Sequence, residues 1–361
     1  MSTVKHYGTL FPTGVVGSLP RSAYVRDLMS GAEGGRSREE SLDAAVAYAV
    51  GLQEAAGLDI VTDGEWRRSS YIGVIAELAH GFETGVNPTD GRPWTTVTAP
   101  VAPKSPGFVA REAQFLKSVT RVRTKATLPA PALLGERMWD PERSSGVYPK
   151  RNDFVRACVP ILRREAQLLV DAGVDVLQID DPHLCLFVDP EVRAQYEDDG
   201  ASEAAFSVEM NNAVLDGLGS GSSVRRAAHL CRRAGARVRG EACFAGGYET
   251  IIEHLNSLQV DQLTMEFTSP GAGEIAALKG LRPDVEIGLG CVSVHPGQVD
   301  EADTIVERVE EALQVVDAER ILLNPDCGFA PGSAAPVDLD EVYVKLKNQT
   351  EAAARLRERH G

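Results

Sequence analysis

The chain has 361 residues, which is long enough for one large barrel or two ordinary domains. Its hydrophobic fraction of 43% is normal for a globular protein. Its formal net charge of −15 argues against nucleic acid or an anionic membrane as a main partner, since both attract basic surfaces. No apolar run reaches the length of about 18 residues expected of a membrane span, and the first residues lack the apolar core of a signal peptide. The six cysteines do not have the spacing of a disulfide framework, which favours a reducing cytoplasm.

Short β-branched runs alternate with stretches of helical periodicity along the chain. Predicted helices include residues 41–56, 153–172, 248–258 and 302–316. The eight predicted strands cover residues 14–18, 58–62, 125–129, 174–180, 226–230, 262–266, 285–290 and 320–324. This alternation predicts an α/β protein, a (β/α)8 TIM barrel that forms a single domain over residues 1–361. The rival fold, an open doubly wound sheet, would need a glycine-rich phosphate turn after the first strand, and Gly17-Ser18-Leu19-Pro20 is not one.

Two irregular stretches interrupt the alternation. Residues from about 71 to 123 are rich in Gly, Pro and Thr and contain short strand-like pieces, which predicts an inserted hairpin or lid after the second strand. Residues from about 198 to 223, with Gly-Ser-Gly-Ser at 219–222, predict a mobile loop.

Polar side chains follow nearly every predicted strand. In a barrel of this kind the carboxyl ends of the strands meet at one mouth, where the chemistry collects. The residues at these ends are Ser18, Glu65, Asp180, Asp181, His229, Cys231, Glu266, His295 and Cys327. One such residue means little, but their repetition at one mouth predicts an active site.

The pair His229-x-Cys231, with Cys327 far downstream, indicates a metal site. Two thiolates and an imidazole form a soft ligand set that favours zinc. A spacing of two places His229 and Cys231 on the same side of an extended segment. The chain has no C-x-x-C knuckle, so a reactive metal is favoured over a structural one. Each residue alone has an ordinary alternative, a buried cysteine or a hydrogen-bonded histidine, and Cys243 is a competing candidate ligand.

These residues resemble the catalytic half of cobalamin-independent methionine synthase and its single-barrel relatives. The similarity runs from about residue 13 to residue 330. The turn at Gly17-Ser18-Leu19-Pro20 is similar to the family's Gly-Ser-Phe-Pro, and Asp63-Gly64-Glu65 to its His-Gly-Glu. Gln178-Ile179-Asp180-Asp181-Pro182 resembles Gln-Ile-Asp-Glu-Pro, His229-Leu230-Cys231 matches His-x-Cys, and Asn324-Pro325-Asp326-Cys327-Gly328 is identical to the closing motif. Gly246-Gly247-Tyr248-Glu249 is closer to the short branch of the family.

The resemblance implies a role for each matched residue. It implies zinc as cofactor, held by His229, Cys231, Glu266 and Cys327. It implies that homocysteine is bound by Ser18, Glu65 and Asp180, that His295 donates the proton to the leaving group, and that Trp139 stacks on a pterin. The implied reaction is transfer of a methyl group to homocysteine, giving methionine, by a cytoplasmic enzyme.

The methyl donor stays open, because the full-length family enzyme has a second, N-terminal barrel that this chain is too short to contain. The donor is N5-methyltetrahydrofolate or a methylcorrinoid, and the acceptor could also be a different thiol. The alternative function is a metal-free lyase resembling uroporphyrinogen decarboxylase. That activity would require arginines at the mouth to hold substrate carboxylates, for which Arg67, Arg68 and Arg137 are the candidates.

Overall fold

A parallel sheet of seven strands forms the centre of the protein. The computed structural model describes residues 7–30, 38–89, 93–219, 223–232, 245–268, 273–330 and 338–361. The strands follow the order β1-β4-β5-β6-β7-β8-β9. They are β1 (Ile60–Val61), β4 (Arg123–Pro129), β5 (Val176–Asp180), β6 (Arg225–Leu230), β7 (Gln262–Glu266), β8 (Glu286–Val292) and β9 (Ile321–Pro325). All neighbouring pairs are parallel, so their carboxyl ends lie at one edge of the sheet.

The sheet is curled, because its two edge strands, β1 and β9, both form bridges with the segment Thr13–Gly14. Thr13 forms a parallel bridge with Leu323 of β9, and Gly14 forms one with Ile60 of β1. The result is an α/β fold with a curled parallel sheet, consistent with the predicted TIM-like barrel. Of the predicted strand at 14–18, only Gly14 takes part in these bridges. At Gly17 the backbone passes so close to Glu65 that a Cβ would lie 2.9 Å from its Oε1.

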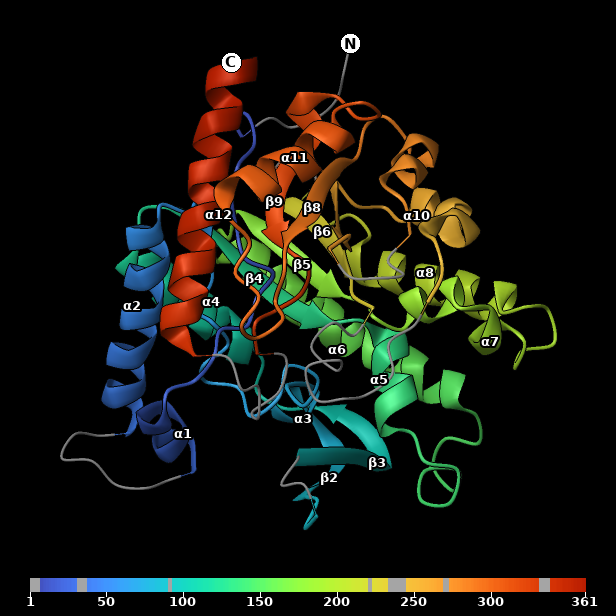
Figure 1. Ribbon diagram of the computed structural model, residues 1–361. Coiled ribbons are helices and arrows are strands. Elements are labelled where there is room, and N and C mark those ends of the chain that lie inside the picture. The colour runs from blue at the N-terminus through green and yellow to red at the C-terminus, as the bar shows by residue number, and fades with distance from the viewer. Residues whose placement is uncertain are drawn as a thin grey trace.

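Helices cover the outside of the sheet. In Figure 1, α2 and α12 lie on one side of the strands, and α8 and α10 lie on the opposite side. Strands β5, β7, β8 and β9 are buried along their whole length, as expected for a parallel sheet covered by helices. The α-helices are α1 (Ala23–Ser30), α2 (Arg38–Ala56), α3 (Ile75–Leu78), α4 (Phe108–Val119), α5 (Pro131–Met138), α6 (Arg151–Asp171), α7 (Pro190–Arg193), α8 (Ala201–Leu215), α10 (Ile252–Ser257), α11 (Ala302–Ala312) and α12 (Leu339–His360). The 3-10 helices are η1 (Leu184–Val188), η2 (Tyr248–Ile251), η3 (Ile275–Gly280) and η4 (Ala318–Arg320).

The predicted insertion at about 71–123 contains an antiparallel hairpin. Strands β2 (Ala79–Val86) and β3 (Pro93–Pro103) pair with each other and not with the central sheet. Figure 1 shows them at one end of the molecule, below the central strands. Gly81, with φ of 106°, stands at the register shift between His80 and Phe82. A Cβ there would lie 2.7 Å from the carbonyl oxygen of Ala99, so this shift requires glycine.

The prediction of an irregular loop over 198–223 was wrong for most of that range, because α8 occupies residues Ala201–Leu215. Its buried residues Ala204, Val208, Asn211 and Leu215 recur at helical spacing. Gly219, the first residue of the Gly-Ser-Gly-Ser run that suggested a loop, follows the helix, as does Gly217, and Gly200 precedes it in a left-handed conformation.

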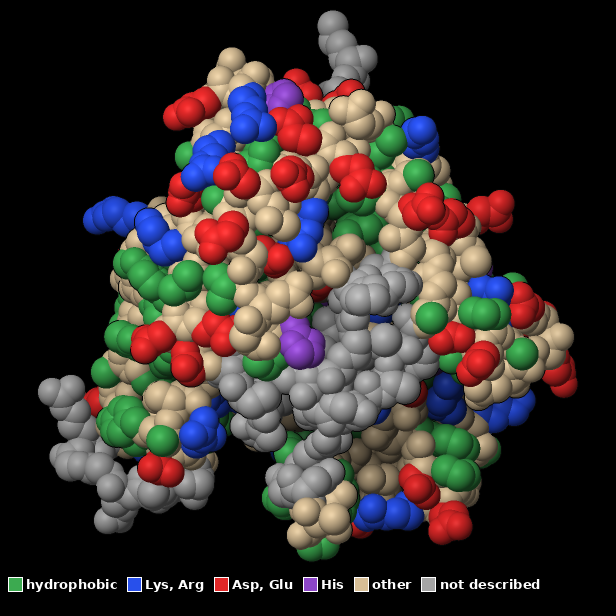
Figure 2. Space-filling view, viewed as in Figure 1, with side chains coloured by type: hydrophobic (Ala, Val, Ile, Leu, Met, Phe, Trp, Pro, Cys, Tyr) green, Lys and Arg blue, Asp and Glu red, His purple; other side chains and the backbone are tan. Residues whose placement is uncertain are grey.

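Neither the surface charge nor the helices contradict what the composition suggests about nucleic acid and membranes. Figure 2 shows acidic and basic side chains interspersed over the face in view, without a field of basic charge. Within the described residues, no helix combines the length and the apolar character that a membrane crossing requires.

Candidate metal centre

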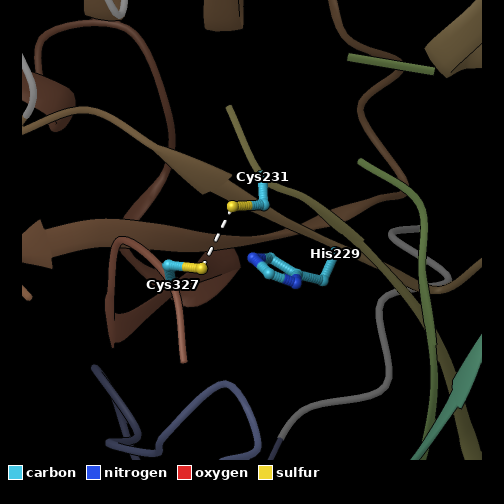
Figure 3. A group of neighbouring side chains, drawn as sticks. All are labelled: His229, Cys231 and Cys327. Atoms are coloured by element: carbon cyan, nitrogen blue, oxygen red, sulfur yellow. Dashed lines mark hydrogen bonds between the residues drawn. The ribbon is translucent and has the colours of Figure 1, made fainter. Parts of the chain in front are cut away.

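Three predicted ligands meet at the carboxyl ends of β6 and β9. His229 lies near the end of β6, Cys231 directly follows this strand, and Cys327 follows β9. One ligand atom from each residue lies within 4.8 Å of the others, and all three side chains are buried. Figure 3 shows the two sulfurs facing each other, with one ring nitrogen of His229 directed toward them. The Sγ atoms are 3.0 Å apart, and one thiol donates a hydrogen bond to the other.

A carboxylate behind the imidazole fixes the orientation of His229. Asp180 ends β5, the neighbour of β6, and the register pairs Asp180 with His229. Its Oδ1 accepts hydrogen bonds from His229 Nδ1 at 3.0 Å and from Gln178 Nε2 at 2.7 Å. With the proton on Nδ1, the lone pair lies on Nε2, as in the carboxylate–histidine arrangement common at zinc sites.

The free Nε2 of His229 is the clearest sign of a missing partner. This atom is buried and has no hydrogen-bond partner among the described residues. Burial lowers the pKa of His229, but the bonded Asp180 carboxylate and the nearby Cys231 outweigh it and raise the pKa to about 10. A buried nitrogen directed at two thiols fits a soft metal ion, which would replace the proton.

Glu266, the fourth predicted ligand, lies outside this group of three in the structure. It ends β7 and is fully buried. Its Oε2 accepts a hydrogen bond of 3.1 Å from the backbone N–H of Arg232, the residue after Cys231. The carboxylate is therefore held beside the site by the same segment that carries one of the thiols.

Ser18 and Glu65 lie on two turns that pack closely. Ser18 Oγ accepts a hydrogen bond from the Ala330 N–H, and a Cβ at Gly328 would overlap this hydroxyl. The turn of Cys327 therefore packs directly on Ser18. Glu65 has a left-handed backbone with φ of 59°, and its Oε1 accepts a hydrogen bond of 2.6 Å from Thr127. Such an outlier in a non-glycine residue is typical of functional turns.

The charge of Glu65 depends on its neighbours. Burial raises its pKa, the guanidinium of Arg68 lowers it, and the nearby Asp180 raises it again. Arg68 is itself buried and forms an ion pair of 2.8 Å with Glu112, while Arg67 pairs with Asp43 and Arg137 with Glu136. The three arginines proposed to hold substrate carboxylates are thus engaged with carboxylates of the protein.

His295 and Trp139 lie outside the group of three ligands. His295 is exposed after β8, and its Nδ1 lies 3.2 Å from the carbonyl oxygen of Pro296. Trp139 follows α5, is half-buried, and donates from its indole nitrogen to the carbonyl oxygen of Tyr148 at 2.9 Å. Cys158, Cys185 and Cys291 are buried outside the metal group, and Cys243 lies outside the described residues.

The structure adds three residues that the sequence did not single out for the site: Tyr71, Arg232 and Tyr248. Burial raises the pKa of the Tyr71 phenol, and the charges of Cys231 and Asp180 raise it further, so this phenol lies in the field of the group. Arg232 is buried directly after Cys231, and Tyr248 contacts the ends of β6 and β7. Only Tyr248 stood in a segment with a family resemblance.

Comparison with known proteins identifies the family. The model of the cobalamin-independent synthase catalytic domain matches residues 11–355, nearly the whole chain. The chain belongs to the cobalamin-independent methionine synthase family. It is 26% identical over 333 residues to the methionine synthase of Sulfolobus acidocaldarius, covering 89% of this chain and 86% of that protein. It is 28% identical over 371 residues to YxjH of Bacillus subtilis, an uncharacterized protein, covering 97% and 96%. This family of methyltransferases therefore includes relatives of this length.

Solved structures show the same fold. A B12-independent methionine synthase from Shewanella, determined with selenomethionine, superimposes with a TM-score of 0.79 at 21% identity, covering 97% of this chain and 99% of the other. A methyltransferase from Methanosarcina mazei superimposes with a TM-score of 0.61 at 16% identity, covering 96% and 94%. At these identities the likeness concerns the fold.

Proposed function

We propose that this protein is a zinc-dependent methyltransferase that transfers a methyl group to the thiol of homocysteine and so forms methionine. The observation that carries the proposal is the convergence of His229, Cys231 and Cys327, with a buried His229 Nε2 that has no hydrogen-bond partner among the described residues. Family membership adds that the chain is a methyltransferase of the methionine synthase type.

The ligands present fit zinc. Two thiolates and one imidazole, together with Glu266 as the fourth ligand, would hold the zinc ion. Glu266 is the ligand suited to yield its place, because oxygen is the harder donor and Arg232 N–H already offers its carboxylate another partner. Bound zinc would supply a Lewis acid that keeps a substrate thiol deprotonated at neutral pH. Asp180 would hold His229 in the tautomer that directs Nε2 to the site.

An amino-acid thiol suits the carboxylates beside the metal group. Glu65 and the second oxygen of Asp180 would hold the substrate ammonium, while Ser18 with its backbone N–H would hold the carboxylate. Asp180 joins the two functions, since its Oδ1 already accepts from His229 and Gln178. This arrangement would place an acceptor sulfur beside the thiols of Cys231 and Cys327.

The donor is proposed to be N5-methyltetrahydrofolate, with a methylcorrinoid as the alternative. A tertiary amine is a poor leaving group, so transfer from folate requires a proton at the departing nitrogen. His295 would supply it, since its exposed ring can meet a large donor from solvent. Trp139 would stack on the pterin, with its indole fixed by the bond to Tyr148. The β2–β3 hairpin is proposed as a lid over this mouth, in a cytoplasmic enzyme with a single barrel domain.

Metal analysis and parallel assays test the proposal. Protein expressed in zinc-replete medium should contain about one zinc per chain. It should methylate homocysteine from methyltetrahydrofolates or from methylcobalamin. Absence of metal would overturn the mechanism, whereas zinc binding with activity only toward another thiol would overturn the choice of acceptor. The lyase alternative has less support, because Arg67, Arg68 and Arg137 are paired within the protein.

A further inference from the structure

The phenol of Tyr248 connects the ends of β6 and β7, two of the three strands whose ends carry proposed metal ligands. Its hydroxyl accepts a hydrogen bond of 2.9 Å from the backbone N–H of Glu266, the last residue of β7. The same hydroxyl lies 3.3 Å from the carbonyl oxygen of Leu230, the last residue of β6, and 3.4 Å from that of Glu266, and its single proton is shared between them. One side-chain atom thus bonds to main-chain groups of both strands.

This connection lies where the main-chain pairing of the two strands ends. The register of β6 and β7 runs from Ala227–Gln262 to Leu230–Met265. Past the last of these pairs, Cys231 follows the end of β6, and Glu266 is the last residue of β7. The phenol therefore joins two segments just where their strand pairing ends: the segment of β6 that carries His229 and Cys231, and the end of β7 that carries Glu266. The distance between these proposed ligands depends on the hydrogen bonds of the phenol to both segments.

The rest of the Tyr248 side chain is fixed by its surroundings. The residue is fully buried, and the guanidinium carbon of Arg232 lies 4.2 Å from the centre of its ring. The ring of Phe267 packs against it with centroids 5.5 Å apart. Arg232 also binds the carbonyl oxygen of Gly246, and a Cβ at Gly246 would overlap the carbonyl oxygen of Val188. Tyr248 is thus a rigid part of the site, since both its ring and its backbone are packed.

We infer that Tyr248 is a positioning residue that sets the distance between the His229–Cys231 segment and the Glu266 end of β7 in the metal site. The inference rests on the proposed zinc site. The hydrogen bonds of the Tyr248 hydroxyl go to the backbone of Glu266 and of Leu230, the residue before Cys231, as an outer partner holds the groups that bind a metal.

The chain offers a matched control on the same strand. Tyr7 is also buried, and its hydroxyl donates a hydrogen bond of 3.1 Å to Gln262, the first residue of β7. Tyr248→Phe and Tyr7→Phe each remove one buried phenolic hydroxyl from opposite ends of β7. Both variants are titrated with Co²⁺ as the probe metal, and the absorption bands of the bound cobalt report its ligand geometry. Circular dichroism of the metal-free proteins reports folding.

Tyr248→Phe should lower the Co²⁺ affinity about 10–100-fold and shift the ligand-field bands, while Tyr7→Phe leaves both as in the wild type. Equal affinity and spectra in the two variants would overturn the inference. So would a metal-free Tyr248→Phe protein that fails to fold, because the residue would then be structural. Wild-type protein that binds neither Co²⁺ nor zinc would instead refute the proposed function, which keeps the two failures distinct.

Discussion

The two ends of the central sheet both bury polar side chains, but they do so differently. At the amino ends of the strands, Arg225 forms an ion pair of 3.0 Å with Glu286, and its guanidinium carbon lies 3.5 Å from the centre of the Tyr7 ring. The Tyr7 hydroxyl donates to Gln262, and Arg123 donates to the Tyr7 carbonyl oxygen at 2.6 Å. The charged and polar groups of this cluster are therefore hydrogen-bonded or ion-paired to one another.

At the carboxyl ends of the strands, some buried polar atoms have no hydrogen-bond partner among the described residues. These atoms include His229 Nε2 and Asp63 Oδ2. The thiols of Cys231 and Cys327 face the imidazole from the side on which its lone pair lies.

The difference separates a stabilising cluster from a binding site. Burying an unsatisfied polar atom costs about 1–3 kcal/mol, so a fold retains such atoms where an outside partner completes them. The cluster of Tyr7, Arg225, Gln262 and Glu286 at the amino end needs no outside partner, and its residues should affect stability. The carboxyl end needs one, and its residues should affect binding.

The largest effect is expected from Cys231→Ala. Removing a thiolate ligand should abolish stoichiometric zinc binding, a greater loss than the roughly 10–100-fold that follows removal of an outer partner. Elemental analysis of the purified variant measures it. Cys291→Ala is the control, because Cys291 is also buried but lies outside the metal group. Equal zinc contents in both variants would show that Cys231 is not a ligand of the metal.

His295→Ala should retain zinc and thiol binding but lose about 10²–10⁴-fold in turnover with a methyltetrahydrofolate donor, since the departing nitrogen would lack its proton. Steady-state rates with that donor and with methylcobalamin measure the effect. Methylcobalamin has a good leaving group, so the variant should be far less impaired with it. Equal losses with both donors would show that His295 has a positioning or structural role.

Glu286→Gln tests the amino end. The change removes the carboxylate that compensates the buried charge of Arg225, and breaking a buried pair costs about 3–5 kcal/mol of unfolding free energy. Chemical denaturation measures this loss. Zinc affinity should stay as in the wild type, because the pair lies at the opposite end of the strands. A variant with normal stability and weakened zinc binding would contradict the assignment.

Much of the site was predictable because it depends on spacing and topology. His229 and Cys231 are separated by one residue at a strand end, and parallel strands bring Cys327 to the same edge. In the structure these three side chains lie together, and their role as metal ligands stays a prediction. The place of Glu266 was not predictable, since a bond from the Arg232 N–H, invisible in the sequence, decides where its carboxylate points.

Other features depend on tertiary packing. Tyr248 acquires its place only because the chain returns at Gly246 and inserts the ring between two strand ends. Tyr71 likewise takes its position by packing against the main hydrophobic core, which the local sequence does not record. Of the first predicted strand only Gly14 forms a bridge, and the close approach of the Gly17 backbone to Glu65 is a contact that residue patterns do not record.

The smallest effect, and the most informative, is expected from Asp180→Asn. The amide can still accept from His229 Nδ1, but without the negative charge that strengthens the bond, so zinc affinity should fall about 10–100-fold. Homocysteine should also bind more weakly, because its ammonium would lose a carboxylate. Competition with a chelator measures the first effect, and the dependence of rate on homocysteine measures the second. The control is Asp175→Asn, since Asp175 precedes the same strand and accepts from Thr124 at the amino end. Unchanged zinc affinity with weakened homocysteine binding would assign Asp180 to the substrate alone, and the imidazole would then owe its orientation to packing.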